Sequence, residues 1–305
     1  MSGASEVRQA PSAAGVVAVG LLHTLRARQW TKNSVVFAAL LFSKHLDDST
    51  SLLRSVAAFG VFCLLSSTVY LLNDVFDLAS DRRHPTKRLR PVAAGVVPPA
   101  LAAGTGLVLG IGGLIAGWLL QPRFALVGAV YLAANLMYSA WLKKVVIVDV
   151  MVISAGFVLR AVAGGLAIDV EVSGWLILCT ILLSLFLALG KRRQELALLQ
   201  DAAQHRSILS EYSVAFLDQM ITIVTAATLV AYCSYTLSEE VRHKAGTDLL
   251  YLTVPFVIYG IFRYLYLVHK REMGGNPTEA LLSDPPLMVD IALWAGAAAL
   301  ILYLT

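Results

Sequence analysis

Long apolar segments recur along this chain, and they constrain its fold more than any other feature. A helix crosses the hydrocarbon core of a bilayer with about 20 apolar residues, and candidate segments of this kind are separated by charged or Pro/Gly-marked breaks. Their limits are 34–46, 52–74, 99–120, 123–142, 146–167, 173–190, 214–237, 248–268 and 287–304. Because 58% of the residues are hydrophobic and only 14% are charged, a water-soluble domain is not expected. The sequence predicts an all-α integral membrane protein with nine transmembrane helices.

The distribution of basic residues orients these spans. Segments retained in the cytoplasm carry an excess of Lys and Arg. With the N-terminus inside, most of the 24 Lys and Arg residues fall in inner segments, and the outer loops hold Lys44, Arg54, Arg123, Arg242 and Lys244. We therefore expect a cytoplasmic N-terminus, a multi-pass protein of the cell (inner) membrane, and function at the inner face. The longest polar connections lie there, at 75–98, 190–213 and 269–286.

The first residues differ from the rest of the chain. Residues 1–14 are small and polar, and the first apolar stretch, 15–22, is too short to cross a bilayer. We expect residues 1–24 to form a disordered or interfacial N-terminal segment and residues 25–305 to form a single transmembrane domain. The net charge of +4 reflects the bias toward basic inner loops and contact with membrane lipid, so nucleic-acid binding is not expected.

A group of oxygen-bearing side chains ends the second predicted span. Asn73, Asp77 and Asp81 follow one another at i, i+4 and i+8, a spacing that places them on one helical stripe about 12 Å long. Acids at a helix C-terminus are unfavourable in the helix dipole unless a cation joins them. Oxygen ligands suit Mg²⁺, which takes one or two carboxylates and leaves its other positions to water and substrate phosphates. The stripe predicts a magnesium site for a diphosphate-bearing substrate; the alternative is a solvated helix end.

A basic loop, residues 82–91, follows this stripe directly. Its five Lys and Arg residues are Arg82, Arg83, Lys87, Arg88 and Arg90. Pro85 and Pro91 end helices and predict that the segment folds as a loop over the site. Guanidinium and ammonium groups bind phosphate oxygens, so the loop predicts the other half of a polyphosphate site. The alternative is a positive-inside signal or a set of lipid-headgroup anchors.

These motifs resemble those of a known family. The pattern Asn73-Asp-x-x-Asp77-x-x-x-Asp81, followed by Arg90-Pro91-x-Ala-x-Gly95, is similar to the first signature of the UbiA superfamily of intramembrane prenyltransferases. Residues 28–33, 81–91 and 190–196 are similar to its decaprenyl-phosphate phosphoribosyltransferase branch, and the similarity runs from about residue 25 to the end. The resemblance implies a UbiA-type bundle of nine helices.

The resemblance also implies a reaction. Ordinary members carry a second Asp-rich motif after the sixth helix, whereas this chain has Lys191-Arg192-Arg193 there. One acidic and one basic cluster suit a substrate with phosphate at both ends. The branch implies Mg²⁺-dependent transfer of 5-phosphoribose from phosphoribosyl diphosphate to a long-chain polyprenyl (decaprenyl) phosphate, which releases diphosphate and forms an arabinan precursor for cell-wall biosynthesis.

The site residues follow from this reading. Asn73, Asp77 and Asp81 are expected to bind the metal and to act in catalysis together with Lys87 and Arg90. The expected phosphate-binding residues are Lys32, Arg82, His84, Tyr138, Lys143, Arg160, Lys191 and Arg192. Lys32, Tyr138 and Lys143 match motifs of the branch. Arg160 has two open readings, as part of a lipid-phosphate cavity or as a structural ion-pair partner, and for Lys191 and Arg192 helix-dipole and positive-inside effects are the alternative.

Two other functions stay open at this point. A UbiA-type prenyltransferase would move a prenyl group from prenyl diphosphate to an aromatic or other acceptor. An ion-coupled transporter would also carry acids at membrane depth, although here the charged groups cluster at one interface and no pair of broken spans marks a midplane site. The sequence leaves open whether the chain forms a homo-oligomer.

Overall fold

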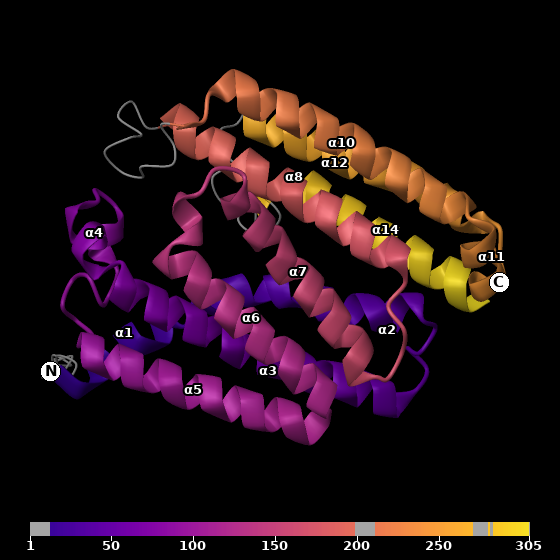
Figure 1. The fold of residues 1–305 in the computed structure, drawn as a ribbon. Coiled ribbons are helices and arrows are strands. Elements are labelled where there is room, and N and C mark those ends of the chain that lie inside the picture. The colour runs from indigo at the N-terminus through magenta and orange to yellow at the C-terminus, as the bar shows by residue number, and fades with distance from the viewer. Residues whose placement is uncertain (1–12, 199–210, 271–279, 281–282, 305) are drawn as a thin grey trace, which may run out of the picture.

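The membrane helices form one bundle. The computed structural model describes residues 13–198, 211–270, 280 and 283–304, and all regular structure in that part is helical. It contains eight helices that are long and apolar enough to cross a membrane, which lie side by side in Figure 1. They are α3 (Ser49–Phe76), α5 (Pro99–Leu120), α6 (Pro122–Ala140), α7 (Val148–Ala167), α8 (Gly174–Leu198), α10 (Val214–Leu237), α12 (Val254–Lys270, entered through η5, Leu249–Thr253) and α14 (Pro285–Leu304). The all-α membrane fold is confirmed.

Local sequence signals begin several of these helices. The Asp48 carboxylate accepts hydrogen bonds from the backbone N–H groups of Thr50 (3.1 Å) and Ser51 (2.9 Å) and caps α3. Pro99 and Pro122 stand at the first position of α5 and α6, where the missing N–H costs nothing. The expected limits of these spans follow the apolar runs between such signals.

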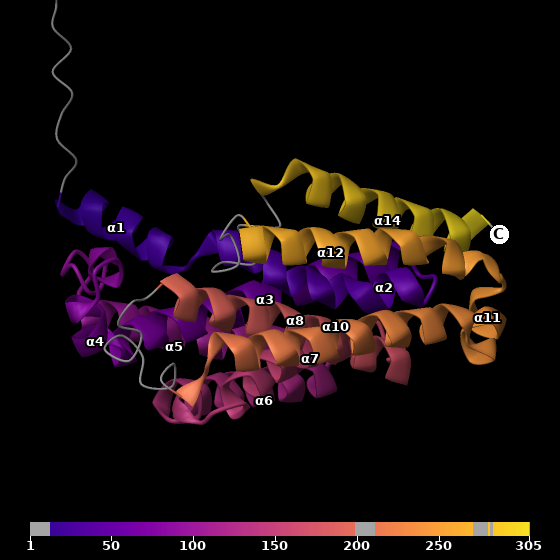
Figure 2. The ribbon, with the colours of Figure 1, turned by 90° about the horizontal axis from the view of Figure 1, so that it is seen from above.

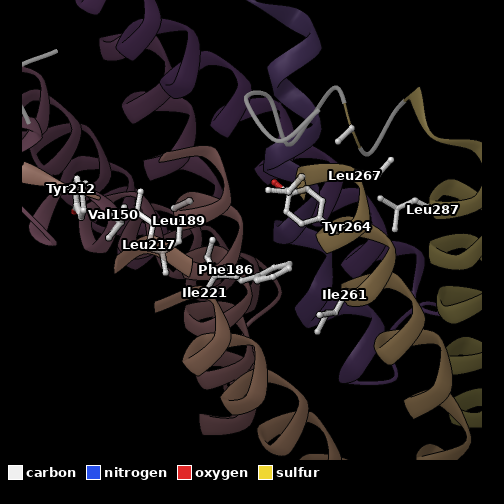
Figure 3. Packing of buried hydrophobic residues seen from close by; sticks show 13 residues of the cluster. Val150, Phe186, Leu189, Tyr212, Leu217, Ile221, Ile261, Tyr264, Leu267 and Leu287 are labelled. Carbon is white, nitrogen blue, oxygen red and sulfur yellow. The ribbon is translucent and has the colours of Figure 1, made fainter. Parts of the chain in front are cut away.

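The helices pack in chain order. Each contacts the next from α3 to α8, α8 contacts α10, α10 contacts α12, and α12 contacts α14. The circuit closes through a segment near the N-terminus, because the Phe42 ring lies 6.2 Å from the Trp294 ring of α14. One buried apolar cluster, drawn in Figure 3, joins five of these helices through Val150, Phe186, Leu217, Tyr264 and Leu287. Connections 190–213 and 269–286 are described only in part.

The span expected over 34–46 is not confirmed. The chain there forms a 3₁₀-helix, η1 (Ala27–Phe37), and a short α-helix, α2 (Ala38–Phe42). This segment runs antiparallel to α3, since Trp30 Nε1 donates to Ser67 Oγ (3.1 Å) and the Phe37 ring centroid lies 5.5 Å from that of Phe59. At about 2.0 Å per 3₁₀ residue and 1.5 Å per α residue it is about 30 Å long, so it runs along much of α3 without being a regular α-helix.

Polar side chains explain this irregular segment. Thr31 Oγ1 and Ser34 Oγ donate to backbone carbonyls three residues earlier, bonds that compete with α-helical ones. Asn33 is buried, donates to Ser66 of α3 and accepts from Arg160 of α7. Gly164 of α7 permits the close approach, because a Cβ atom there would stand 2.1 Å from the Val36 carbonyl oxygen.

The N-terminal segment is helical in its described part. Residues Ala13–Thr24 form α1, which lies at the α4 (Leu78–Arg83) end of the bundle (Figure 2). This differs from the expectation of a disordered lead-in over 1–24, while an interfacial position remains a prediction; residues 1–12 lie outside the described part. The cytoplasmic N-terminus and the division at residue 24 stay predictions.

Candidate active site

The predicted Asn/Asp stripe (Asn73, Asp77 and Asp81) is bent at its middle residue. Helix α3 ends at Phe76, Asp77 stands between the helices, and Asp81 belongs to α4. The Asp77 N–H donates to the Asn73 carbonyl (2.8 Å), and the Asp81 N–H donates to the Asp77 carbonyl (2.8 Å), so α-type bonds stand on both sides of the bend. The side chains stay neighbours, although they do not form the straight 12 Å line that the spacing predicts.

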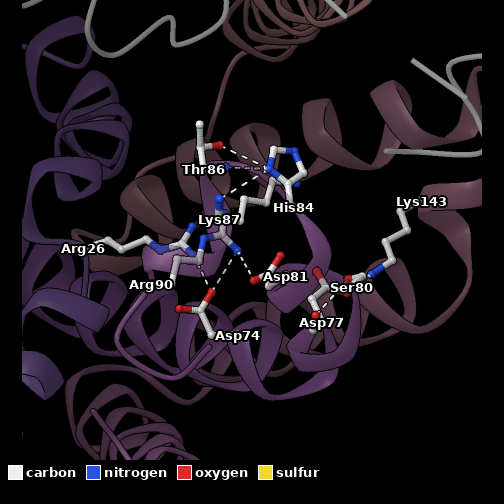
Figure 4. A network of polar contacts seen from close by, with 10 residues as sticks. All are labelled: Arg26, Asp74, Asp77, Ser80, Asp81, His84, Thr86, Lys87, Arg90 and Lys143. Carbon is white, nitrogen blue, oxygen red and sulfur yellow. Dashed lines mark hydrogen bonds and ion pairs between the residues drawn. The ribbon is translucent and has the colours of Figure 1, made fainter. Parts of the chain in front are cut away.

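Each acid of the stripe meets a cation from another part of the chain. Lys143 Nζ lies 2.5 Å from Asp77 Oδ1, and Arg90 Nη1 lies 2.7 Å from Asp81 Oδ2. The Ser139 hydroxyl donates to Asn73 Oδ1. Figure 4 shows Asp77 and Asp81 reaching toward these separate cations. The negative charges of Asp77 and Asp81, which would repel one another, are thus neutralised by Lys143 and Arg90. The sequence predicts such basic groups beside the stripe.

Asp74 joins the same network, and the sequence analysis missed it. This side chain is only 2% exposed, and its Oδ1 pairs with Arg26 Nη2 at 2.5 Å and with Arg90 Nη1 at 3.2 Å. Arg90 therefore bridges Asp74 and Asp81. Asp74 is the second residue of the Asn73–Asp81 motif, but the helical spacing places it off the stripe. Its ion pairs with Arg26 and Arg90 are what show that it helps to hold Arg90 in place.

The basic loop covers this network. It contains η2 (Lys87–Leu89), and the His84 ring nitrogen Nδ1 accepts the backbone N–H groups of Thr86 (3.3 Å) and Lys87 (3.4 Å). Arg82 Nε donates to the Ala93 carbonyl (3.4 Å). In Figure 4 the Lys87 and His84 side chains lie on the same side of the stripe as Arg90. The structure therefore brings Arg90 into contact with Asp81 of the stripe, and Lys87 and His84 lie in the same loop as Arg90.

The donor set restricts which metal complex fits here. Within the described ranges, no three His, Cys, Asp or Glu side chains converge as ligands for a metal ion. The stripe offers one amide and two carboxylate groups, each carboxylate already beside a cation. Such a set suits a magnesium ion that takes its remaining ligands from water and a substrate diphosphate, not a closed protein cage.

Arg192 belongs to a buried network that joins α6, α7 and α8. It is 1% exposed, and its guanidinium donates to Asp149 Oδ2 (2.7 Å), Glu195 Oε2 (2.5 Å) and the Tyr138 hydroxyl (3.1 Å). Each of these contacts uses a different nitrogen of the guanidinium. The contacts favour a structural role for Arg192, because the fully buried Asp149 carboxylate depends on this cation. Phosphate binding by Arg192 stays a prediction.

Lys191 and Lys32 form the second basic group, and their surroundings differ from those of Arg192. Lys191 is half-exposed, and its Nζ lies 3.8 Å from Glu195 Oε1. Lys32 is partly buried on η1, and no hydrogen bond or ion pair joins it to any residue that the structure describes. Burial, and after it the charges of Lys191, Arg160 and Arg26, lowers the pKa of Lys32 to about 7. The charged form of Lys32 is therefore unfavourable unless an anionic ligand joins it.

Arg160 holds the bundle together. Its Nε donates to Asn33 Oδ1 (2.8 Å), Nη1 to the Gly156 carbonyl (2.7 Å) and Nη2 to the Tyr131 hydroxyl (2.8 Å). The guanidinium also lies over the Tyr131 ring, 4.7 Å from its centroid. These contacts tie η1, α6 and α7, but they are all with neutral groups and no ion pair joins Arg160 to an acid among the described residues. The lipid-phosphate cavity stays a prediction.

Fold and site together define a class of protein, a membrane bundle with an Asp-rich motif at one helix end beneath a basic loop. Residues 33–278 match the model of the UbiA prenyltransferase family, and the chain belongs to this family. A UbiA homologue from Archaeoglobus fulgidus, solved bound to GPP and Mg²⁺, shares the fold with a TM-score of 0.71 at 16% identity. The likeness covers 93% of this chain and 99% of that chain.

Relatives in sequence place the chain within the family. It is 39% identical over 287 residues to the decaprenyl-phosphate phosphoribosyltransferase of Mycobacterium tuberculosis, covering 92% of this chain and 94% of the relative. The enzyme of the same name from Mycolicibacterium smegmatis is 36% identical over 300 residues, covering 93% and 92%. The resemblance that the motifs indicate is confirmed over nearly the whole chain.

Proposed function

We propose that this chain is a polyprenyl-phosphate phosphoribosyltransferase, a pentosyltransferase that moves 5-phosphoribose from phosphoribosyl diphosphate to a long-chain polyprenyl phosphate such as decaprenyl phosphate. One observation carries the proposal: the cytoplasmic end predicted for α8 brings the charge of Lys191 close enough to act on Lys32, at the place where ordinary members of the family have a second Asp-rich motif. Two separate basic groups suit a donor with phosphate at both ends. The names of the relatives support the same assignment.

The residues of the stripe would act on the leaving group. In the reaction the bond between ribose C1 and the diphosphate oxygen breaks, and a bond from C1 to an oxygen of the lipid phosphate forms. Lys143 and Arg90 now pair with Asp77 and Asp81. When the donor binds, these two cations would contact the diphosphate oxygens and stabilise the negative charge of the leaving group. A magnesium ion held by Asn73, Asp77 and Asp81 would neutralise the leaving diphosphate as a Lewis acid. The acceptor is already anionic, so no general base is required.

The other end of the donor would meet Lys32 and Lys191. Its 5-phosphate would supply the counter-charge that Lys32 lacks among its described neighbours. The prenyl tail would lie along the apolar helices, with its phosphate entering from the membrane at this end. The positive-inside rule supports a site on the cytoplasmic face of the cell membrane.

A donor comparison tests the reaction. Purified protein with Mg²⁺ is given labelled phosphoribosyl diphosphate or prenyl diphosphate, each with and without polyprenyl phosphate or an aromatic acceptor. We expect release of diphosphate from phosphoribosyl diphosphate only when polyprenyl phosphate is present. Turnover of prenyl diphosphate with phosphoribosyl diphosphate inert would assign an ordinary prenyltransferase, and solute flux into proteoliposomes without a covalent product would assign a transporter.

Loss of either lysine should weaken donor binding. Lys32→Ala and Lys191→Ala are each expected to raise the KM for phosphoribosyl diphosphate about tenfold or more, because a charge-assisted hydrogen bond contributes about 1.5–3 kcal/mol. Steady-state kinetics at saturating polyprenyl phosphate measure this. Lys244→Ala is the matched control, since Lys244 pairs with Glu240 on α11 (Glu239–Ala245) at the opposite end of the bundle. An unchanged KM in both variants would move the 5-phosphate site elsewhere.

A further inference from the structure

The turn that enters α7 adopts a rare backbone conformation. Ile147 has φ 68° and ψ −44°, and the Val148 N–H donates to the Val146 carbonyl at 2.8 Å. These values describe a γ-turn of the positive-φ form, which is strained for any residue and more so for a β-branched one. Strain of this kind persists only where neighbouring contacts hold it, and such sites cluster at functional positions.

Tyr212 supplies the contact that holds this turn. Its hydroxyl accepts the Ile147 N–H at 2.7 Å and donates to Asp149 Oδ1 at 2.9 Å. The residue is 5% exposed and comes from the described end of the connection between α8 and α10. Burial raises the pKa of Tyr212 to about 12, so its hydroxyl keeps the proton that it donates. Asp149 is fixed in turn by Arg192.

The held turn lies next to the Asn/Asp stripe. Lys143 sits in η3 (Leu142–Lys144), and the backbone from there to α7 is a series of tight turns, with Val145 N–H bonded to Leu142 and Asp149 N–H bonded to Val145. A displacement at Ile147 therefore reaches η3 over only a few residues. Lys143 must extend from η3 to within 2.5 Å of Asp77, so the position of η3 decides whether that contact forms.

We propose that Tyr212 is a positioning residue of the diphosphate site, which holds the Ile147 turn so that Lys143 faces Asp77. The inference rests on the proposed function only in that the site binds a diphosphate, a group common to both candidate donors. Tyr212 touches neither substrate nor metal in this role. It acts through the backbone between α6 and α7, and the sequence pattern contains no motif that marks it.

The test is a double-mutant cycle with Tyr212→Phe and Lys143→Met, run on whichever diphosphate donor the wild type uses. Tyr212→Phe keeps the ring in its cavity and removes both hydrogen bonds. We expect kcat to fall about tenfold with the KM for polyprenyl phosphate unchanged, and faster hydrogen exchange at the Ile147 amide. In the Lys143→Met background, Tyr212→Phe should have little further effect, because both changes act on the same contact.

Tyr232→Phe is the matched control. The Tyr232 hydroxyl also makes two buried contacts, with Thr253 Oγ1 (2.7 Å) and Trp294 Nε1 (2.8 Å), but far from the stripe, so kcat should not change. Wild-type kcat in Tyr212→Phe, or effects of the two variants that multiply in the double variant, would overturn the proposal. If the wild type uses prenyl diphosphate as its donor, the proposed function is wrong. The double-mutant cycle of Tyr212 and Lys143 can then be run with that donor and still tests the role of Tyr212.

Discussion

Asp77→Asn is expected to remove nearly all transfer activity while the protein keeps its fold. The substitution preserves the shape of the side chain and removes the charge that a magnesium diphosphate needs at the centre of the stripe. We expect a fall in kcat/KM of more than about 100-fold and a higher Mg²⁺ concentration at half-maximal rate. Magnesium titrations of diphosphate release measure both effects. Asp77 is partly exposed, so Lys143 left without its partner can still reach water.

The control for this variant is Asp248→Asn. Asp248 lies between α11 and η5 at the opposite end, pairs loosely with Arg242 at 3.5 Å and is well exposed. Its activity and magnesium dependence should match those of the wild type. Near-normal turnover in Asp77→Asn, with both variants folded by size-exclusion chromatography in detergent, would refute the assignment of the metal to the stripe.

Arg192→Met is expected to act mainly on stability. It leaves Asp149, which is fully buried, without its cation, and removing one partner of a buried ion pair costs about 3–5 kcal/mol. This revises what the sequence motif alone indicates, because a phosphate-binding residue would raise KM in place of lowering stability. Thermal unfolding in detergent and the folded yield measure the change.

The neighbouring Arg193 offers a matched comparison. Its guanidinium pairs with Asp218 Oδ1 at 2.5 Å, but both side chains are partly exposed, so Arg193→Met should cost less than about 1 kcal/mol. If Arg192→Met instead unfolds like the wild type and raises the KM for phosphoribosyl diphosphate, Arg192 belongs to the phosphate site after all.

Much of the fold could be predicted because apolar length and helix-capping signals are local. Eight membrane helices follow from runs of apolar residues between Pro, Asp and Ser signals. The segment 27–42 escaped prediction, since its irregular path depends on Asn33 bonding to α3 and α7 and on the space left by Gly164. Hydropathy alone does not report such partners.

The membrane helices, the Asn/Asp motif and the basic loop could be predicted, because each depends on residues within a few turns of one another. The partners of the charged side chains could not, because they come from distant parts of the chain. Lys143 meets Asp77 across 66 residues, Arg192 meets Asp149 across 43, and Arg160 meets Asn33 across 127. The sequence pattern grouped Arg192 and Arg160 with Lys191 and Lys32, because it reports their charge and not the contacts that long-range packing gives each of them.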